Sequence, residues 1–187
     1  MDFINENRVN ALLSGMLAER LGFSPTKARQ IRIAASLHDI GKLKLPHGLI
    51  NKPGKLSTEE FEVMKTHTKL GADLFSSVKG DIGEVVRGVC LWHHEKWDSS
   101  GYWGMKAAEL PAYIPIVSVV DVFTALVSAR VYKRAWLVTD ALEYIKNQAG
   151  KQFGGELVEA FLSLIYEDGV LETICNTLEG VSNISGR

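Results

Sequence analysis

The sequence is poor in cysteine, in long apolar runs and in net charge, and each shortage excludes a class of protein. Two cysteines in 187 residues, with no CxxC pair, argue against a disulfide framework and against a thiolate zinc site. No apolar run approaches the roughly 18 residues of a membrane-spanning helix, and the first residues lack a signal-peptide layout. A net charge of −1 provides no bulk field for nucleic acid or an anionic membrane. We therefore expect a cytoplasmic protein with no DNA, RNA or membrane partner.

The remaining composition is that of an ordinary globular protein, with 46% hydrophobic and 23% charged residues. Apolar residues recur at helical spacing along most of the chain, and the apolar run over 112–130 is long enough to favour a buried helix over a strand. We expect one all-α domain over 1–169 and a weakly patterned C-terminal tail over 170–187. The expected helices cover 4–21, 25–41, 57 onward through His67, 80–94, 112–130, 139–150 and 155–168, and the loops cover 43–56 and 95–110.

Four of the five histidines lie beside other polar residues or within apolar helical segments. Asp121 interrupts the run Val-Ser-Val-Val-Asp-Val-Phe, where an unpaired carboxylate would be costly to bury. A metal ion, a buried salt bridge or a helix cap would each offset that cost. Taken singly, each histidine also has an ordinary structural explanation in core packing or hydrogen bonding.

Together these residues supply four imidazoles and two carboxylates, a donor set that suits Mn, Fe, Ni or Zn better than Ca or Mg. Six ligands are too many for one catalytic ion with open positions, and they suit two divalent ions that share a carboxylate. We expect Fe or Mn, with Ni or Zn as alternatives. The expected ligands are His38, Asp39, His67, His93, His94 and Asp121.

Longer motifs surround these residues, and in order and spacing they resemble the HD-GYP family, a branch of the HD metal-dependent phosphohydrolases. The resemblance covers about residues 5–165, so it extends far beyond a His-Asp dipeptide. The motifs are HDIGK (38–42), LPHGLINKPGKLSTEEF (45–61), MKTHTKLGADLF (64–75), HHEKWDSSGYWG (93–104) and IVSVVDVFTALVSARVYKRAW (116–136).

The resemblance implies a compact HD-domain helical bundle with a central metal site. It also implies hydrolysis of cyclic di-GMP to the linear dinucleotide, and in some members on to GMP. Asp39 would bridge two ions and act in catalysis, and Lys42 would reach the scissile phosphate. Tyr102, Arg130 and Lys133 match positions that contact the nucleotide.

The sequence departs from the family pattern in three places. Asn5 stands where the first helix usually carries a metal-binding histidine, which favours two ions over three. In the namesake loop, Ser99 replaces a glycine that can take positive φ cheaply, and Trp103 replaces a proline that fixes φ. Thr124 stands where an aspartate commonly follows the metal-binding Asp121. The loop's aromatic residues could stack on a guanine or pack over the rim of the core.

These departures leave two alternatives to an active cyclic di-GMP phosphodiesterase. One is a catalytically weak HD-GYP relative that works as a sensor or protein-interaction module. The other is an HD hydrolase of another cyclic dinucleotide or a nucleotide, because fold does not fix substrate. Besides the cyclic dinucleotide, a sensor domain or a diguanylate cyclase is an expected partner.

Overall fold

The computed structural model describes residues 3–128 and 135–179, and it contains helices and no β-strand in these ranges. This confirms the expected all-α architecture. The elements are α1 (Phe3–Arg20), α2 (Pro25–Leu37), the 3₁₀ helix η1 (Ile40–Lys44), α3 (His47–Ile50), α4 (Thr58–Lys65), α5 (His67–Leu74), α6 (Asp81–Trp92), the 3₁₀ helix η2 (Ala107–Glu109), α7 (Ile114–Val127), α8 (Val138–Asn147), α9 (Gly155–Ile165) and α10 (Val170–Glu179).

Local capping explains where the early helices begin. Ser24 caps α2 by accepting a hydrogen bond from the Lys27 backbone N–H, and Pro25 occupies the first helical position. Ser57 and Glu60 form a reciprocal capping box at the start of α4, which agrees with the helix predicted from residue 57. The helix predicted over 139–150 is α8, which begins one residue earlier, at Val138, and ends at Asn147.

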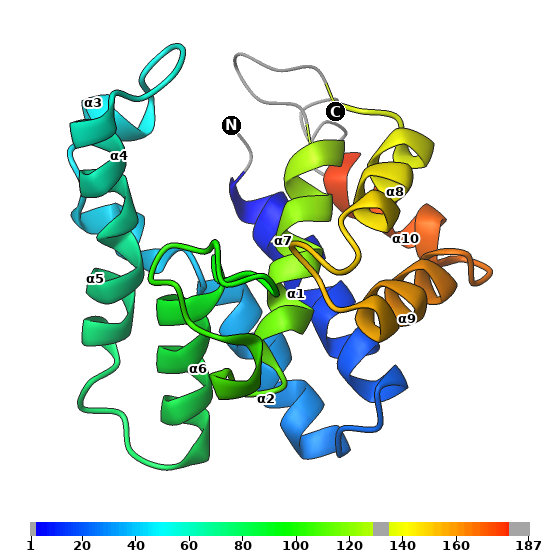
Figure 1. Cartoon of the computed structure of the whole chain (residues 1–187). Coiled ribbons are helices and arrows are strands. Elements are labelled where there is room, and N and C mark those ends of the chain that lie inside the picture. Colours follow the sequence, from blue (N-terminus) through cyan, green and yellow to red (C-terminus); the bar gives the residue numbers. More distant parts are fainter. Residues whose placement is uncertain (1–2, 129–134, 180–187) are drawn as a thin grey trace, which may run out of the picture.

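The helices α1 and α7 lie at the centre of the bundle (Figure 1). Helix α1 packs on α2, α7, α9 and α10, while α6 joins α2 to α5. Apolar side chains fill the core between these helices. Leu13 and Leu17 of α1 are completely buried, and the ring of Phe123 in α7 packs edge-to-face against Phe161 of α9. Burial of these side chains holds α7, and with it Asp121, in a fixed position.

Two segments differ from the sequence expectation. The single helix expected through His67 is two helices, α4 and α5, because the helix is interrupted at Thr66. The Thr66 hydroxyl donates a hydrogen bond to the Val63 carbonyl at this point. The expected tail forms α10 over its first ten residues, and Ile174 of that helix is buried in the core. Apolar residues of α10 pack on α1 and α9, contacts that a local pattern does not reveal.

Two further features bear on the predictions from composition. Cys90 is buried and Cys175 exposed, and both are free. None of the described helices has the length and apolar character that would be required to cross a bilayer.

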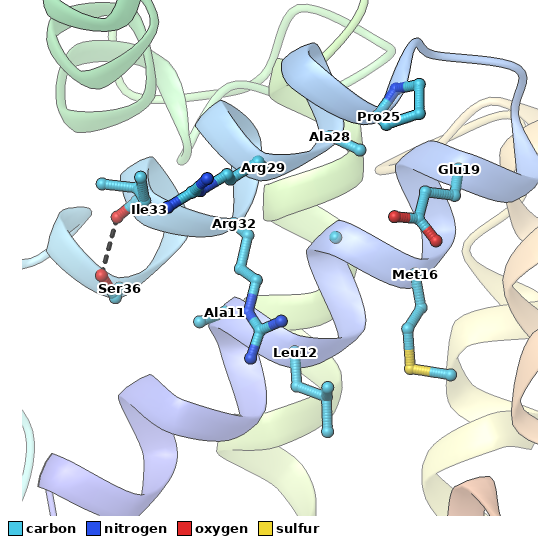
Figure 2. Close-up of a pocket in the computed structure, with 11 residues that line it drawn as sticks. Ala11, Leu12, Met16, Glu19, Pro25, Ala28, Arg29, Arg32, Ile33 and Ser36 are labelled. Carbon is cyan, nitrogen blue, oxygen red and sulfur yellow. Dashed lines mark hydrogen bonds between the residues drawn. The ribbon is translucent and has the colours of Figure 1, made fainter.

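A groove of about 600 Å³ runs between α1 and α2, with Arg29 and Arg32 along it (Figure 2), and none of the expected metal ligands lines it.

Candidate metal centre

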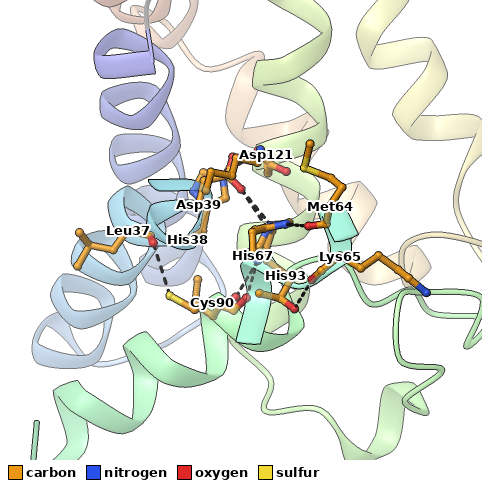
Figure 3. Close-up of polar contacts among 12 residues, drawn as sticks. Leu37, His38, Asp39, Met64, Lys65, His67, Cys90, His93 and Asp121 are labelled. Atoms are coloured by element: carbon orange, nitrogen blue, oxygen red, sulfur yellow. Dashed lines mark hydrogen bonds and ion pairs between the residues drawn. The ribbon is translucent and has the colours of Figure 1, made fainter. Parts of the chain in front are cut away.

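The structure brings the six expected ligands together from four parts of the chain. Figure 3 shows His38, Asp39, His67, His93 and Asp121 among them. His38 and Asp39 follow the end of α2, and His67 begins α5. His93 and His94 follow α6, while Asp121 lies in α7. The ends of three helices and the middle of a fourth therefore meet at one place, as expected for a site at the centre of a bundle.

The ligands form two overlapping groups. In the first, one donor atom from each of Asp39, His67, His93 and His94 lies within 4.8 Å of every other. In the second, His38, His93 and Asp121 meet the same criterion. His93 belongs to both groups, so they form one continuous cluster.

Backbone carbonyls fix the orientation of three of the rings. Nδ1 of His38 lies 2.7 Å from the Ala35 oxygen, Nδ1 of His67 lies 2.7 Å from the Met64 oxygen, and Nδ1 of His93 lies 3.0 Å from the Val89 oxygen. A carbonyl only accepts hydrogen bonds, so each Nδ1 carries the proton. Each Nε2 then faces the cluster, which is the usual arrangement of a metal-binding histidine.

Asp39 faces both groups with different oxygens. Its Oδ1 lies 3.2 Å from His67 Nε2 and 3.7 Å from His93 Nε2. Its Oδ2 lies 3.4 Å from His38 Nε2 and 2.5 Å from the Lys42 ammonium. One carboxylate thus presents an oxygen to each half of the cluster.

Local charge shifts the pKa values of the cluster. Burial opposes protonation of His38, but Asp39 and Asp121 outweigh it and raise its pKa to about 10. Burial also opposes ionisation of Asp39 and Asp121. Lys42 and His38 nevertheless lower the Asp39 pKa well below its ordinary value, and His38 lowers that of Asp121. The carboxylates are therefore ionised at neutral pH and attract a cation, whether a proton or a metal ion.

The residues present fit a divalent metal. Among the described residues, His38 Nε2 and Asp39 Oδ1 are buried polar atoms that face other donor atoms of the cluster without a well-formed hydrogen bond, which is costly unless an ion is held there. Burial and the neighbouring His93 lower the His94 pKa well below its ordinary value, so that ring is neutral and available as a ligand. Imidazoles with carboxylates suit a transition-metal ion.

Glu95 holds the loop that follows His94. Its carboxylate oxygens accept hydrogen bonds from the backbone N–H groups of Trp103, at 2.7 Å, and Met105, at 2.8 Å. Gly101 passes so close that a Cβ there would lie 2.5 Å from the Glu95 Cα. Ser99 adopts φ 63°, so this position keeps the backbone conformation that favours glycine although the glycine is gone.

The expected nucleotide contacts have different outcomes. The Tyr102 ring stacks on His94, with 4.3 Å between centroids, and burial raises its pKa to about 12. Lys42 pairs with Asp39 at the edge of the cluster. Arg130 and Lys133 lie outside the described residues.

The loop's tryptophans pack against the protein. Trp103 donates its indole N–H to Thr68, and Lys69 Nζ lies 3.9 Å from the centre of its ring. Trp97 covers Gly154, where an added Cβ would lie 2.9 Å from the indole. These contacts give both rings a structural role.

The other departures lie along α1 and α7. Asn5 is buried and donates to the Leu178 carbonyl of α10, and Glu6 beside it belongs to neither ligand group. Thr124 is buried in α7. Asn10 of α1 reaches the cluster, with its amide nitrogen 3.4 Å from Asp121 Oδ1.

Sequence reasoning assigned no role to Asn10, Glu95 or Gly41. For Glu95, its place directly after the His-His pair was an available signal. A Cβ on Gly41 would lie only 1.9 Å from the His67 carbonyl oxygen, so this glycine lets η1 lie against α5. Neither the Asn10 contact nor the Gly41 contact has a local pattern that would predict it.

Comparison with known proteins agrees with this geometry. The HD domain family model matches residues 2–157. A cyclic di-GMP phosphodiesterase of Thermotoga maritima is 44% identical over 153 residues, which are 81% of this chain and 42% of that protein. A 3'3'-cGAMP-specific phosphodiesterase 2 of Vibrio cholerae is 35% identical over 153 residues, which are 81% of this chain and 29% of that protein.

Among solved structures, Bd1817, an HDG"Y"P protein from Bdellovibrio bacteriovorus, matches with a TM-score of 0.70 and 21% identity. The match covers 87% of this chain and 52% of Bd1817, and it supports the fold. The chain spans less than half the length of the two relatives named above. From the family model, these relatives and the converging histidines and aspartates, we conclude that the chain belongs to the HD domain family, in its HD-GYP branch.

Proposed function

We propose that this chain is a metal-dependent phosphodiesterase that hydrolyses cyclic di-GMP to the linear dinucleotide. The observation that carries the proposal is the convergence of four imidazoles and two carboxylates in two overlapping ligand groups. Such a donor set at one place exceeds what a single ion with open positions needs. The name of the 44% identical Thermotoga relative supports cyclic di-GMP as the substrate.

We assign the cluster to two divalent ions, Fe or Mn, with Ni or Zn as the other ions that these donors suit. Asp39 would bridge the ions, because its two oxygens face different halves of the cluster. His93 would serve only one ion, because its Nδ1 is already donating to the backbone. When bound, the ions supply a water of lowered pKa and neutralise charge on the phosphate.

The chain's own residues would orient the substrate. Lys42 holds an ammonium 2.5 Å from Asp39 Oδ2, next to the bridging position, where it can bind a phosphate oxygen. Tyr102 stacks on His94 beside the cluster, and an aromatic ring at this place suits contact with a nucleotide base. Arg130 and Lys133 are assigned to the nucleotide on the family resemblance. The corresponding partner class is a sensor domain or a diguanylate cyclase.

A second function, that of a weakly catalytic sensor or interaction module, draws support from Asn5. Its amide donates to the Leu178 carbonyl of α10, so this side chain is already engaged at the position where the family pattern has a metal-binding histidine. The name of the Vibrio relative supports another cyclic dinucleotide as an alternative substrate.

The test is turnover of cyclic di-GMP by protein loaded anaerobically with Fe²⁺ or Mn²⁺. We expect linear dinucleotide as the first product, and loss of turnover in Asp39→Ala. His47→Ala is the matched control, because His47 is exposed in α3 and belongs to neither ligand group. Bound metal without turnover would contradict the proposed phosphodiesterase activity and favour the sensor function. Cleavage of 3'3'-cGAMP without cleavage of cyclic di-GMP would contradict the proposed substrate.

A further inference from the structure

Asn10 connects the central helix α1 to the ligand cluster. Its Nδ2 lies 3.4 Å from Asp121 Oδ1, across 111 residues of sequence. A carboxylate oxygen only accepts hydrogen bonds, so the amide nitrogen is the Asn10 atom that faces it. With only 1% of its surface exposed, Asn10 makes this bond away from solvent.

The same oxygen of Asp121 also faces a candidate ligand. His38 Nε2 lies 3.2 Å from it, and the ring is fixed by its bond to the Ala35 carbonyl. Asn10 on α1 and His38 at the end of α2 therefore approach the same carboxylate oxygen. A carboxylate that binds a metal is commonly held by a further hydrogen bond, and Asn10 is placed to provide one.

An asparagine is an expensive choice at this position unless its polarity is used. Its Oδ1 is buried without a hydrogen-bond partner in the described part of the chain. Val9 and Leu13 beside it on α1 are completely buried, so an apolar side chain would suit the helix interface without that cost. The amide therefore serves Asp121 and not the packing of α1.

We infer that Asn10 is a positioning residue, which holds Asp121 turned toward His38 so that the two bind one ion. The inference rests on the proposed function, since it assigns Asn10 to one of the two proposed ions. The other ligand group contains neither His38 nor Asp121. Loss of the Asn10 amide should therefore weaken one ion selectively.

The experiment is a calorimetric titration of metal-free protein with Mn²⁺, for wild type, Asn10→Leu, Asn10→Ala and Ser14→Ala. Ser14 is the matched control, because it lies one turn further along α1, is buried, and has a hydroxyl that finds no hydrogen-bond partner among the described residues. We expect two ions in wild type and in Ser14→Ala. In both Asn10 variants, one ion should keep its affinity and the other should bind at least about tenfold more weakly.

Two results would overturn the inference: unchanged affinity for both ions in the Asn10 variants, or equal weakening of both, which would mark a general structural role. Circular dichroism checks that each variant folds, and Asn10→Ala decides the matter if Asn10→Leu does not fold. Cyclic di-GMP turnover is measured on the same wild-type samples. Two bound ions without turnover would contradict the proposed function, yet selective loss of one ion in the variants would still support the positioning role.

Discussion

Replacing Gly41 with alanine should damage the metal centre although residue 41 is not a ligand. An added Cβ would lie 1.9 Å from the His67 carbonyl oxygen and 2.5 Å from the Gly71 nitrogen. Relief to an ordinary contact of 3.4 Å needs a shift of about 1.5 Å between η1 and α5. Both obstacles are backbone atoms, so rotation of a side chain cannot provide that shift.

The shift would separate ligands that must stay close. Asp39 directly precedes η1 and His67 begins α5, and their Oδ1 and Nε2 atoms lie 3.2 Å apart. Metal–ligand distances in protein sites vary by only roughly 0.2 Å. A movement of about 1.5 Å between Asp39 and His67 should therefore lower the affinity for the ion that they share by at least about a hundredfold. Overpacking should also lower the free energy of unfolding by about 1–3 kcal/mol.

The assay combines Mn²⁺ titration with thermal unfolding of the metal-free protein. Gly48→Ala is the matched control, because a Cβ there meets nothing within 4 Å and no positive φ is involved. It should bind metal as wild type does and unfold at the same or a slightly higher temperature. Metal affinity of Gly41→Ala equal to that of wild type would refute the reasoning.

Three further predictions concern the loop and the charges of the cluster. Ser99→Gly should raise the free energy of unfolding by about 1 kcal/mol, because Ser99 adopts φ 63° at a cost that glycine avoids. Thermal unfolding measures this, with Ser100→Gly as the control. A lower melting temperature for Ser99→Gly than for wild type would contradict the prediction. In metal-free protein, His38 has a pKa raised from 6.5 to about 10, so its contribution to stability is complete below pH 6.5 and is lost as pH rises toward 10. Asp39 and Asp121 have lowered pKa values, so the stabilisation that they contribute is present above pH 3.8 and is lost on acidification. Together with His38, these groups therefore stabilise the folded state most between about pH 3.8 and 6.5. Melting temperature against pH in the presence of chelator tests this, and an alkaline loss equally large in His38→Gln and His47→Gln would count against it. Glu95→Ala should speed hydrogen exchange of the Trp103 and Met105 amides at least about tenfold, because both amides donate to the Glu95 carboxylate. Glu109→Ala is the control. Unchanged exchange rates in Glu95→Ala would show that Glu95 does not hold the loop.

The sequence predicts much of this fold because its strongest signals are local. Ser24 followed by Pro25, and the Ser57 to Glu60 capping box, mark helix starts through contacts within one turn. The break at Thr66 escaped prediction because helical spacing continues across it. The helix α10 escaped because its stability comes from packing on α1 and α9, which are distant in sequence.

The candidate site divides in the same way. The six candidate ligands could be proposed because imidazoles and carboxylates inside apolar helices are conspicuous, and the structure brings all six together. Their supporting residues could not be proposed with the same ease, because support depends on distance in space. Asn10 meets Asp121 across 111 residues, and Gly41 matters only because α5 lies against it.

The most direct test of the account is turnover of cyclic di-GMP measured against the number of ions bound per chain. Metal-free protein is loaded anaerobically with increasing Mn²⁺, and each sample is divided between elemental analysis and product chromatography. We expect little linear dinucleotide at one ion per chain and full turnover as the second ion binds. Fewer than about one ion per chain at saturation, or two ions without turnover, would contradict a two-metal phosphodiesterase built from this cluster.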